Sequence, residues 1–134
     1  MKSLKLALIS TILLLSGLNG FVSGQAPEEK DYSSNLKKYH SKRGERCLQC
    51  SNYAPNSYSV FYRNIGTEKI DAKFAVQEAN KQWRTFLRSG IAPKDSVVVY
   101  ACDGTGKSLF WARPSGDTSI EFPTDAVINK EYSK

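Results

Sequence analysis

The stretch Gly104-Thr105-Gly106-Lys107-Ser108 has the Gly-Lys-Ser order of a phosphate-binding loop and follows an apolar run. Such a loop also needs a glycine five residues before the Gly-Lys pair and a helix directly after it, whose amides hold the phosphates. Here Ala101 occupies the glycine position, and the short aromatic segment that follows is stopped by Pro114. We therefore expect a hairpin turn between two strands and no nucleotide at Gly104-Ser108.

Three cysteines, Cys47, Cys50 and Cys102, offer either a disulfide or redox and metal chemistry. Cys47-Leu-Gln-Cys50 has the spacing of half a zinc site, but no second cysteine pair and no histidine pair completes a tetrahedron. Residues 51–56 are turn formers, whereas a redox motif requires a helix at that point. We expect one disulfide from Cys102 to Cys47 or Cys50, a third cysteine left over, and no cofactor or metal.

A general acid and base for RNA cleavage are not both present. Cleavage beside a 2′-hydroxyl needs a base, an acid and a cation that holds the phosphate. Glu121 and Arg113 fit the base and the cation, although a cross-strand ion pair on the solvent face is the simpler explanation. The only histidine, His40, lies far upstream, which also excludes a Ser-His-Asp or Cys-His nucleophile in the same domain. These residues favour binding over catalysis.

The first 24 residues have the pattern of a secretory signal peptide. Lys2 and Lys5 precede an apolar core at residues 6–15, and Val22-Ser23-Gly24 supplies small residues for cleavage. The apolar core is shorter than the roughly 20 residues that span a membrane. We therefore expect a secreted mature chain and no membrane partner.

Residues 25–45 predict a flexible basic arm or a propeptide, because they are charged and lack periodic apolar residues. Lys42-Arg43 is a dibasic pair of the kind that secretory proteases cut, and a plain solvated tail is the alternative. The chain carries 19 basic and 13 acidic residues, a net charge of +6. Much of that excess belongs to the signal peptide and the arm, so the charge alone does not indicate a nucleic-acid footprint.

Residues 68–89 predict one long helix. Thr67 is a suitable N-cap, and Gly90 followed by Pro93 is a stop signal. At 100° per residue, seven apolar residues fall in one sector that would be buried: Ala72, Ala75, Val76, Ala79, Trp83, Phe86 and Leu87.

The opposite side of this helix would be exposed. It would carry Ile70, Phe74, Gln77, Lys81, Arg84 and Arg88. Aromatic and arginine side chains supply most of the binding energy at interfaces, so we expect Phe74, Lys81, Arg84 and Arg88 to contact a partner. The alternative is that Phe74 is covered and the charges only solvate the helix.

Four strands are predicted at residues 58–63, 96–102, 108–113 and 118–122, the last three forming an antiparallel meander. The expected fold is therefore α+β: a single helix packed on an antiparallel sheet of about four strands, with one disulfide. Residues 46–123 form the compact domain in this prediction, and residues 124–134 a C-terminal tail.

This organisation resembles the small secreted effectors of filamentous plant pathogens, in particular the ribonuclease-like group. The resemblance covers residues 47–122 as architecture; the Tyr/Phe/Trp-x-Cys motif that opens many such effectors is replaced by Glu45-Arg46-Cys47. It implies a monomeric virulence effector that is translocated into host cells and binds a host protein without catalysis. RNA binding, weak RNA cleavage and a toxin or antimicrobial role are the alternatives. A second effector architecture, an all-β sandwich with a disulfide, conflicts with the predicted long helix.

Overall fold

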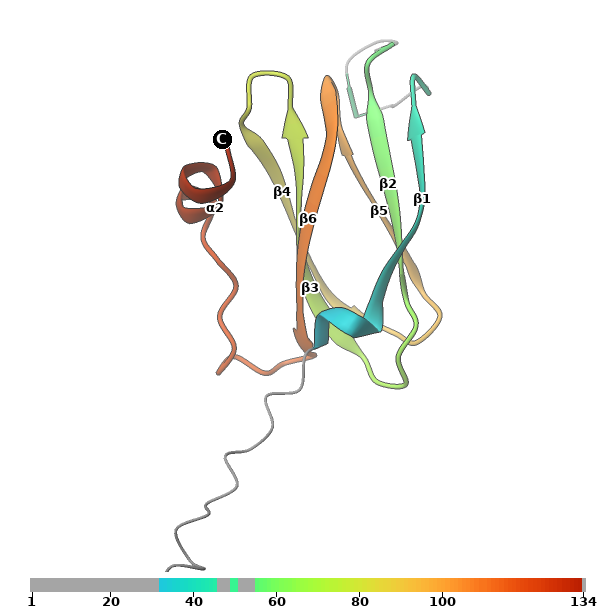
Figure 1. Cartoon of the computed structure of the whole chain (residues 1–134). Coiled ribbons are helices and arrows are strands. Elements are labelled where there is room, and N and C mark those ends of the chain that lie inside the picture. The colour runs from blue at the N-terminus through green and yellow to red at the C-terminus, as the bar shows by residue number, and fades with distance from the viewer. Residues whose placement is uncertain (1–31, 46–48, 51–54, 134) are drawn as a thin grey trace, which may run out of the picture. The chain divides into compact units, whose positions relative to one another are not determined.

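A computed structural model describes residues 32–45, 49–50 and 55–133. These residues form a sandwich of two three-stranded antiparallel sheets with a helix on one outer face (Figure 1). The first sheet has the order β1-β2-β5, with β1 (Leu36–Arg43), β2 (Tyr58–Asn64) and β5 (Ser96–Ala101). The second has the order β4-β3-β6, with β3 (Ile70–Glu78), β4 (Trp83–Ile91) and β6 (Gly104–Pro114). A 3₁₀ helix, η2 (Tyr32–Asn35), precedes β1, and helix α2 (Asp125–Tyr132) follows β6.

The predicted helix at residues 68–89 is wrong, because this segment is the hairpin of β3 and β4. Asn80 accepts a hydrogen bond from the amide of Gln82, and Lys81 adopts a left-handed φ of 73°, which reverses the chain. The apolar residues of β3 then alternate, and four of them face the interior: Ile70, Ala72, Phe74 and Val76. Residues four positions apart lie on the same side of both a strand and a helix. The spacing of the apolar residues therefore fits both structures.

The predicted meander is also wrong. The strands predicted at residues 96–102 and 108–113 exist, but β5 pairs with β2 whereas β6 pairs with β3. The chain therefore crosses from one sheet to the other at Cys102 and Asp103, whose amides both donate to the carboxylate of Glu78. Residues 118–122 form no strand.

The predicted arm and tail are structured where the model describes them. The segment predicted as a flexible arm contains η2 and all of β1, which is paired to β2. The dibasic pair Lys42-Arg43 lies in this strand, and Arg43 donates to the carbonyl of Gly104 at 2.7 Å. The predicted tail forms α2, with Thr124 as its N-cap. The predicted signal peptide lies outside the described residues.

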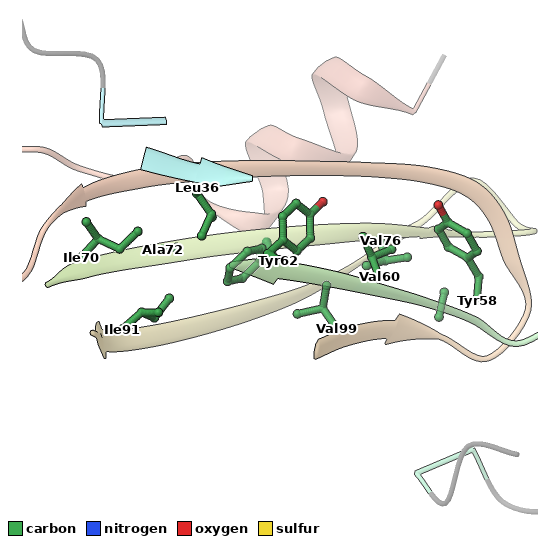
Figure 2. Close-up of a cluster of buried hydrophobic side chains, with 11 residues drawn as sticks. Leu36, Tyr58, Val60, Tyr62, Ile70, Ala72, Val76, Ile91 and Val99 are labelled. Atoms are coloured by element: carbon green, nitrogen blue, oxygen red, sulfur yellow. The ribbon is translucent and has the colours of Figure 1, made fainter. Parts of the chain in front are cut away.

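The main core lies between the two sheets (Figure 2). At its centre the ring of Tyr62 packs against Phe74, with a centroid distance of 4.9 Å, and against Phe110. The hydroxyl of Tyr62 donates to Ser108 at 2.9 Å, so this buried polar atom is satisfied. Each large apolar side chain buried here contributes about 1.5–3 kcal/mol to stability.

Helix α2 covers the outer face of the second sheet. Its Ile128 is buried against Ala75 and Trp83. Its first turn is held by an ion pair between Lys73 and Asp125 at 2.7 Å. The α+β class is therefore confirmed, but the protein is mostly sheet and has two sheets rather than one.

The disulfide joins Cys50 to Cys102 and closes a sequence separation of 52 residues. This confirms that Cys102 pairs with one of the two upstream cysteines. Cys47 lies outside the described residues.

Removal of this disulfide should destabilise the fold strongly. Under a chain-entropy estimate, a loop of this length is worth about 4 kcal/mol, so we expect Cys50→Ser to lower the free energy of unfolding by about that amount. The measurement is urea unfolding followed by tryptophan fluorescence. The matched Cys47→Ser variant keeps the Cys50–Cys102 bridge and should unfold like the unchanged protein; equal losses in both variants would contradict the assigned pairing.

Asp71 should make stability depend on acid pH. Its carboxylate is 4% exposed and accepts bonds from the amides of Gly90 and Gly116 and from the hydroxyl of Ser115. Burial alone would raise its pKa, but these hydrogen bonds and the contact with Arg113 outweigh burial, so the pKa of Asp71 lies below its usual value. Its contribution is therefore complete above the usual aspartate pKa and is lost as the pH falls through the lower, folded-state value.

We expect Asp71→Asn to cost about 1–3 kcal/mol at pH 7 and to lose less of its remaining stability than the unchanged protein between pH 5 and pH 2. Urea unfolding at a series of pH values measures both effects. Parallel pH profiles for the two proteins would show that Asp71 does not carry this dependence.

Candidate functional site

The outer face of the sheet β1-β2-β5 is the candidate binding surface. Among the described elements, α2 lies against the other sheet and none lies over this face (Figure 1). Its outward positions are rich in cations and aromatic rings. We call the following set the cation–aromatic face: Lys37, Tyr39, His40, Lys42, Phe61, Arg63 and Val98.

Strand register explains why these residues share one face. Residues opposite one another on antiparallel strands point to the same side, and Phe61 on the central strand lies opposite His40 on β1 and Val98 on β5. A β-bulge between Lys38 and His40 shifts the register of β1. As a result, the rings of both Tyr39 and His40 contact Phe61, with centroid distances of 6.1 and 5.4 Å.

Cations lie over the aromatic rings of this face. The guanidinium of Arg63 is 4.7 Å from the ring centroid of Tyr39, and the ammonium of Lys42 is 5.9 Å from that of Phe61. Stacking of this kind holds a guanidinium flat while leaving its N–H groups available for hydrogen bonds with an anion. The acidic partner recorded on this face is Glu45, which pairs with Lys42 at 2.9 Å.

A second group of cations and rings lies at the neighbouring edge, where β4 meets β5. Arg84, Phe86 and Arg88 alternate along β4 and so point to the same side. Arg84 lies 5.3 Å from the ring centroid of Tyr100, the ring of Phe86 contacts that of Tyr100 at 5.2 Å, and Arg88 lies over Phe86. We call these four residues the β4-edge cluster.

The structure therefore brings together only part of the predicted binding stripe. Arg84 and Arg88 share one cluster, and Lys81 lies in the turn of the same hairpin. Phe74 is 0% exposed and belongs to the core, as does Ile70, and Gln77 is buried as well. The expected exposure of Phe74 is therefore wrong, because a strand directs residue 74 to the interior where a helix would direct it outward.

The predicted catalytic candidates do not converge. Arg113 is bound within the fold, at 3.5 Å from the carboxylate of Asp71, and it donates to the carbonyl of Ile120. Lys107, the lysine of the Gly104-Ser108 stretch and the other cation of β6 that could contact a phosphate, is six residues from Arg113 along the strand, which corresponds to about 20 Å. Glu121 is exposed in the segment between β6 and α2. These three residues therefore do not form one cleft.

The described residues do not form a phosphate loop or a metal centre. The Gly104-Ser108 stretch is the start of strand β6, with no helix after it, so its amides do not form a phosphate-binding helix terminus. Within the described ranges, no group of three or more His, Cys, Asp and Glu side chains could hold a metal ion. None of the helices in the described part of the chain has the length and apolar character to cross a membrane.

No known protein family, curated protein or solved structure matches this chain.

Sequence reasoning missed most of the cation–aromatic face. Lys37, Tyr39 and His40 belong to a segment that was interpreted as a flexible arm, because its charges hide the strand pattern. The alternation of Phe61 with its neighbours on β2 was visible, but its outward direction was not. The available signal was the coincidence of rings and cations in Lys37–Arg43, which is unusual for a plain solvated tail.

A pair of alanine substitutions separates the core from the surface. Phe74→Ala should lower the free energy of unfolding by about 3–5 kcal/mol, because it removes a ring packed between the sheets. Arg84→Ala should cost about 1 kcal/mol or less, since its ion pair with Glu78 is partly exposed. Thermal and urea unfolding measure both. Similar losses for the two variants would contradict the assignment of Phe74 to the core and Arg84 to the surface.

Proposed function

We propose that this protein is a secreted, monomeric effector that is translocated into host cells and acts by binding a host protein, without catalysis. The observation that carries the proposal is the cation–aromatic face, an uncovered sheet surface on which rings and cations lie together. The partner surface that complements it is acidic.

The composition of this face supports a binding role. The solvent side of an antiparallel sheet is usually polar, yet the centre of this face is made by Phe61, Val98 and Tyr39. Tyr39 is 44% exposed and Val98 is 46% exposed. Apolar area at the centre of a patch, with charges around it, is the arrangement of an interface core and its rim.

The cations of this face would orient an acidic partner and raise the rate of association more than they would raise the affinity. Lys37 and Arg63 lie opposite each other on β1 and β2, and both are exposed. Exposed cations of this kind accelerate the encounter with an acidic partner and penalise partners with a basic surface. The rings would then contribute the apolar contacts after docking.

Single-stranded RNA is the second candidate partner for the same face. Bases stack on aromatic rings, while lysine and arginine contact the phosphates between them. Arg63 stacks on Tyr39, and the ring of Tyr39 contacts that of Phe61. One cation and two rings therefore lie next to one another. This observation favours RNA as the alternative to a protein.

The test compares three versions of the chain without residues 1–24. The first is unchanged, the second carries Phe61→Ala with Arg63→Ala, and the third carries Val127→Ala with Lys130→Ala. The third is a matched control, because it also removes one apolar and one cationic side chain from an exposed surface, that of α2. Each is expressed inside plant cells and purified with its associated proteins, and the recovered partner is then titrated in purified form.

We expect the face variant to bind the purified partner at least tenfold more weakly, and the α2 variant to bind normally. Equal binding by all three would refute the cation–aromatic face as the binding surface. Binding of a 20-nucleotide uridine RNA that weakens steeply between 50 and 200 mM salt, and that is lost in the face variant, would support RNA in place of a protein.

A further inference from the structure

The edge of β6 that does not face β3 lies apart from the cation–aromatic face. A hollow of about 430 Å³ lies along this edge. Its lining consists of residues of β6 and of side chains from β1, β2, β4 and α2: Lys38, Tyr62, Trp83, Gly106, Lys107, Ser108, Leu109, Phe110 and Tyr132.

Both faces of β6 contribute to this hollow. Ser108 and Phe110 point to the interior side, where they contact Tyr62. Leu109 points to the outer side, where it packs in the cluster of Trp83. Side chains from both faces of β6 line the hollow. The hollow therefore passes over the edge of β6 and runs along its backbone.

Within the described part of the chain, β6 is the last strand of its sheet and pairs with β3 alone; the amide of Lys107 donates to the hydroxyl of Thr105, and η2 packs beside the strand. The directions of its amides follow from the hairpin. Trp83 donates its amide to Asn129 on α2, so that amide points away from β3. Successive residues of an antiparallel strand direct their backbone groups to opposite sides. The amide and carbonyl of Leu109 therefore point toward β3, whereas those of Ser108 and Phe110 point to the open edge.

The other edges are occupied or less suited to a new strand. On β4, Asn129 accepts from the amide of Trp83, and the carbonyl of Leu87 accepts from Arg88. β5 has only six residues, and β1 carries a bulge and a high density of cations. β6 is the longest strand, with 11 residues. Native sheets protect edges of this length, so an open one suggests a partner.

The chemistry of the hollow indicates what that partner carries. Its two charged lining residues are Lys38 and Lys107, and no acidic side chain lines it. The outer wall is apolar and aromatic, formed by Leu109, Trp83 and Tyr132. Trp83 is 7% exposed, and its buried indole N–H donates to no described group.

We propose that the free edge of β6 binds an extended peptide segment of another protein by strand addition, and that this segment alternates acidic and apolar residues. Main-chain hydrogen bonds to Ser108 and Phe110 supply affinity, and alternate side chains supply specificity. Acidic side chains face Lys38 on the interior side, and apolar ones face Leu109 on the outer side. A second copy of this chain fits the edge poorly, because pairing of two β6 strands would bring like charges together.

The test uses a fluorescent ten-residue peptide of alternating Glu and Val, with two control peptides. One control alternates Lys and Val, which keeps the apolar content and reverses the charge. The other keeps Glu and Val but carries N-methyl groups on alternate amides, which removes main-chain donors. Fluorescence anisotropy measures affinity, and hydrogen exchange measures which amides of the protein are protected.

We expect the Glu-Val peptide to bind at least tenfold more tightly than either control, with new protection at Ser108 and Phe110. Lys38→Glu should weaken binding at least tenfold, whereas Lys69→Glu, which makes the same charge change away from the hollow, should not. The Phe61→Ala with Arg63→Ala variant should bind the peptide normally, which separates this site from the cation–aromatic face.

Three results would overturn the proposal. The first is equal affinity for the N-methylated peptide, which would mean that charge alone attracts it. The second is protection at β4 or β5 in place of β6. The third is a dimer in sedimentation whose free protein already protects Ser108 and Phe110, since a second copy would then occupy the edge.

Discussion

The packing of the two central strands, β2 and β3, is the interaction on which the rest of the structure depends. Tyr62 of β2 lies against Phe74 of β3 and against Phe110, and its hydroxyl is bonded to Ser108 at the edge of the sandwich. One side chain therefore fills the centre of the core and satisfies its own polar atom. Because side chains alternate along a strand, an inward Tyr62 directs Phe61 and Arg63 outward. The core thus determines which residues can form a binding surface.

The two outer faces of the sandwich differ because only one of them has a helix. On the sheet β4-β3-β6, Ile128 of α2 closes a second, smaller core over Ala75 and Trp83. The outer face of β1-β2-β5 carries rings that no described element covers. The same helix also occupies part of one edge of this sheet, because Asn129 of α2 accepts from the amide of Trp83 on β4. The opposite edge, formed by β6, pairs with no further strand among the described residues. The position of α2 therefore defines both candidate surfaces, the uncovered face and the unpaired edge.

Two carboxylates stabilise the places where the chain changes direction. Glu78 accepts from the amides of Cys102 and Asp103 where the chain crosses between sheets, and Asp71 accepts from Gly90 and Gly116. The pKa of each carboxyl is lowered, since these hydrogen bonds outweigh the burial that alone would raise it. They replace the ladder bonds that a strand end lacks.

The sequence alone determined the local features of this protein. It predicted three of the strands, at residues 58–63, 96–102 and 108–113, the disulfide of Cys102, and a Gly104-Ser108 stretch that does not start a helix. It wrongly predicted a helix at residues 68–89, because Ala72 and Val76 fit both periods and the choice depends on the β2 strand that covers them. It also could not pair β5 with β2 or place β1 beside β2. Pairing between distant strands depends on the complementarity of whole sheet faces, which only the tertiary structure brings together, and for that reason the cation–aromatic face and the open edge of β6 could not be predicted from residue spacing.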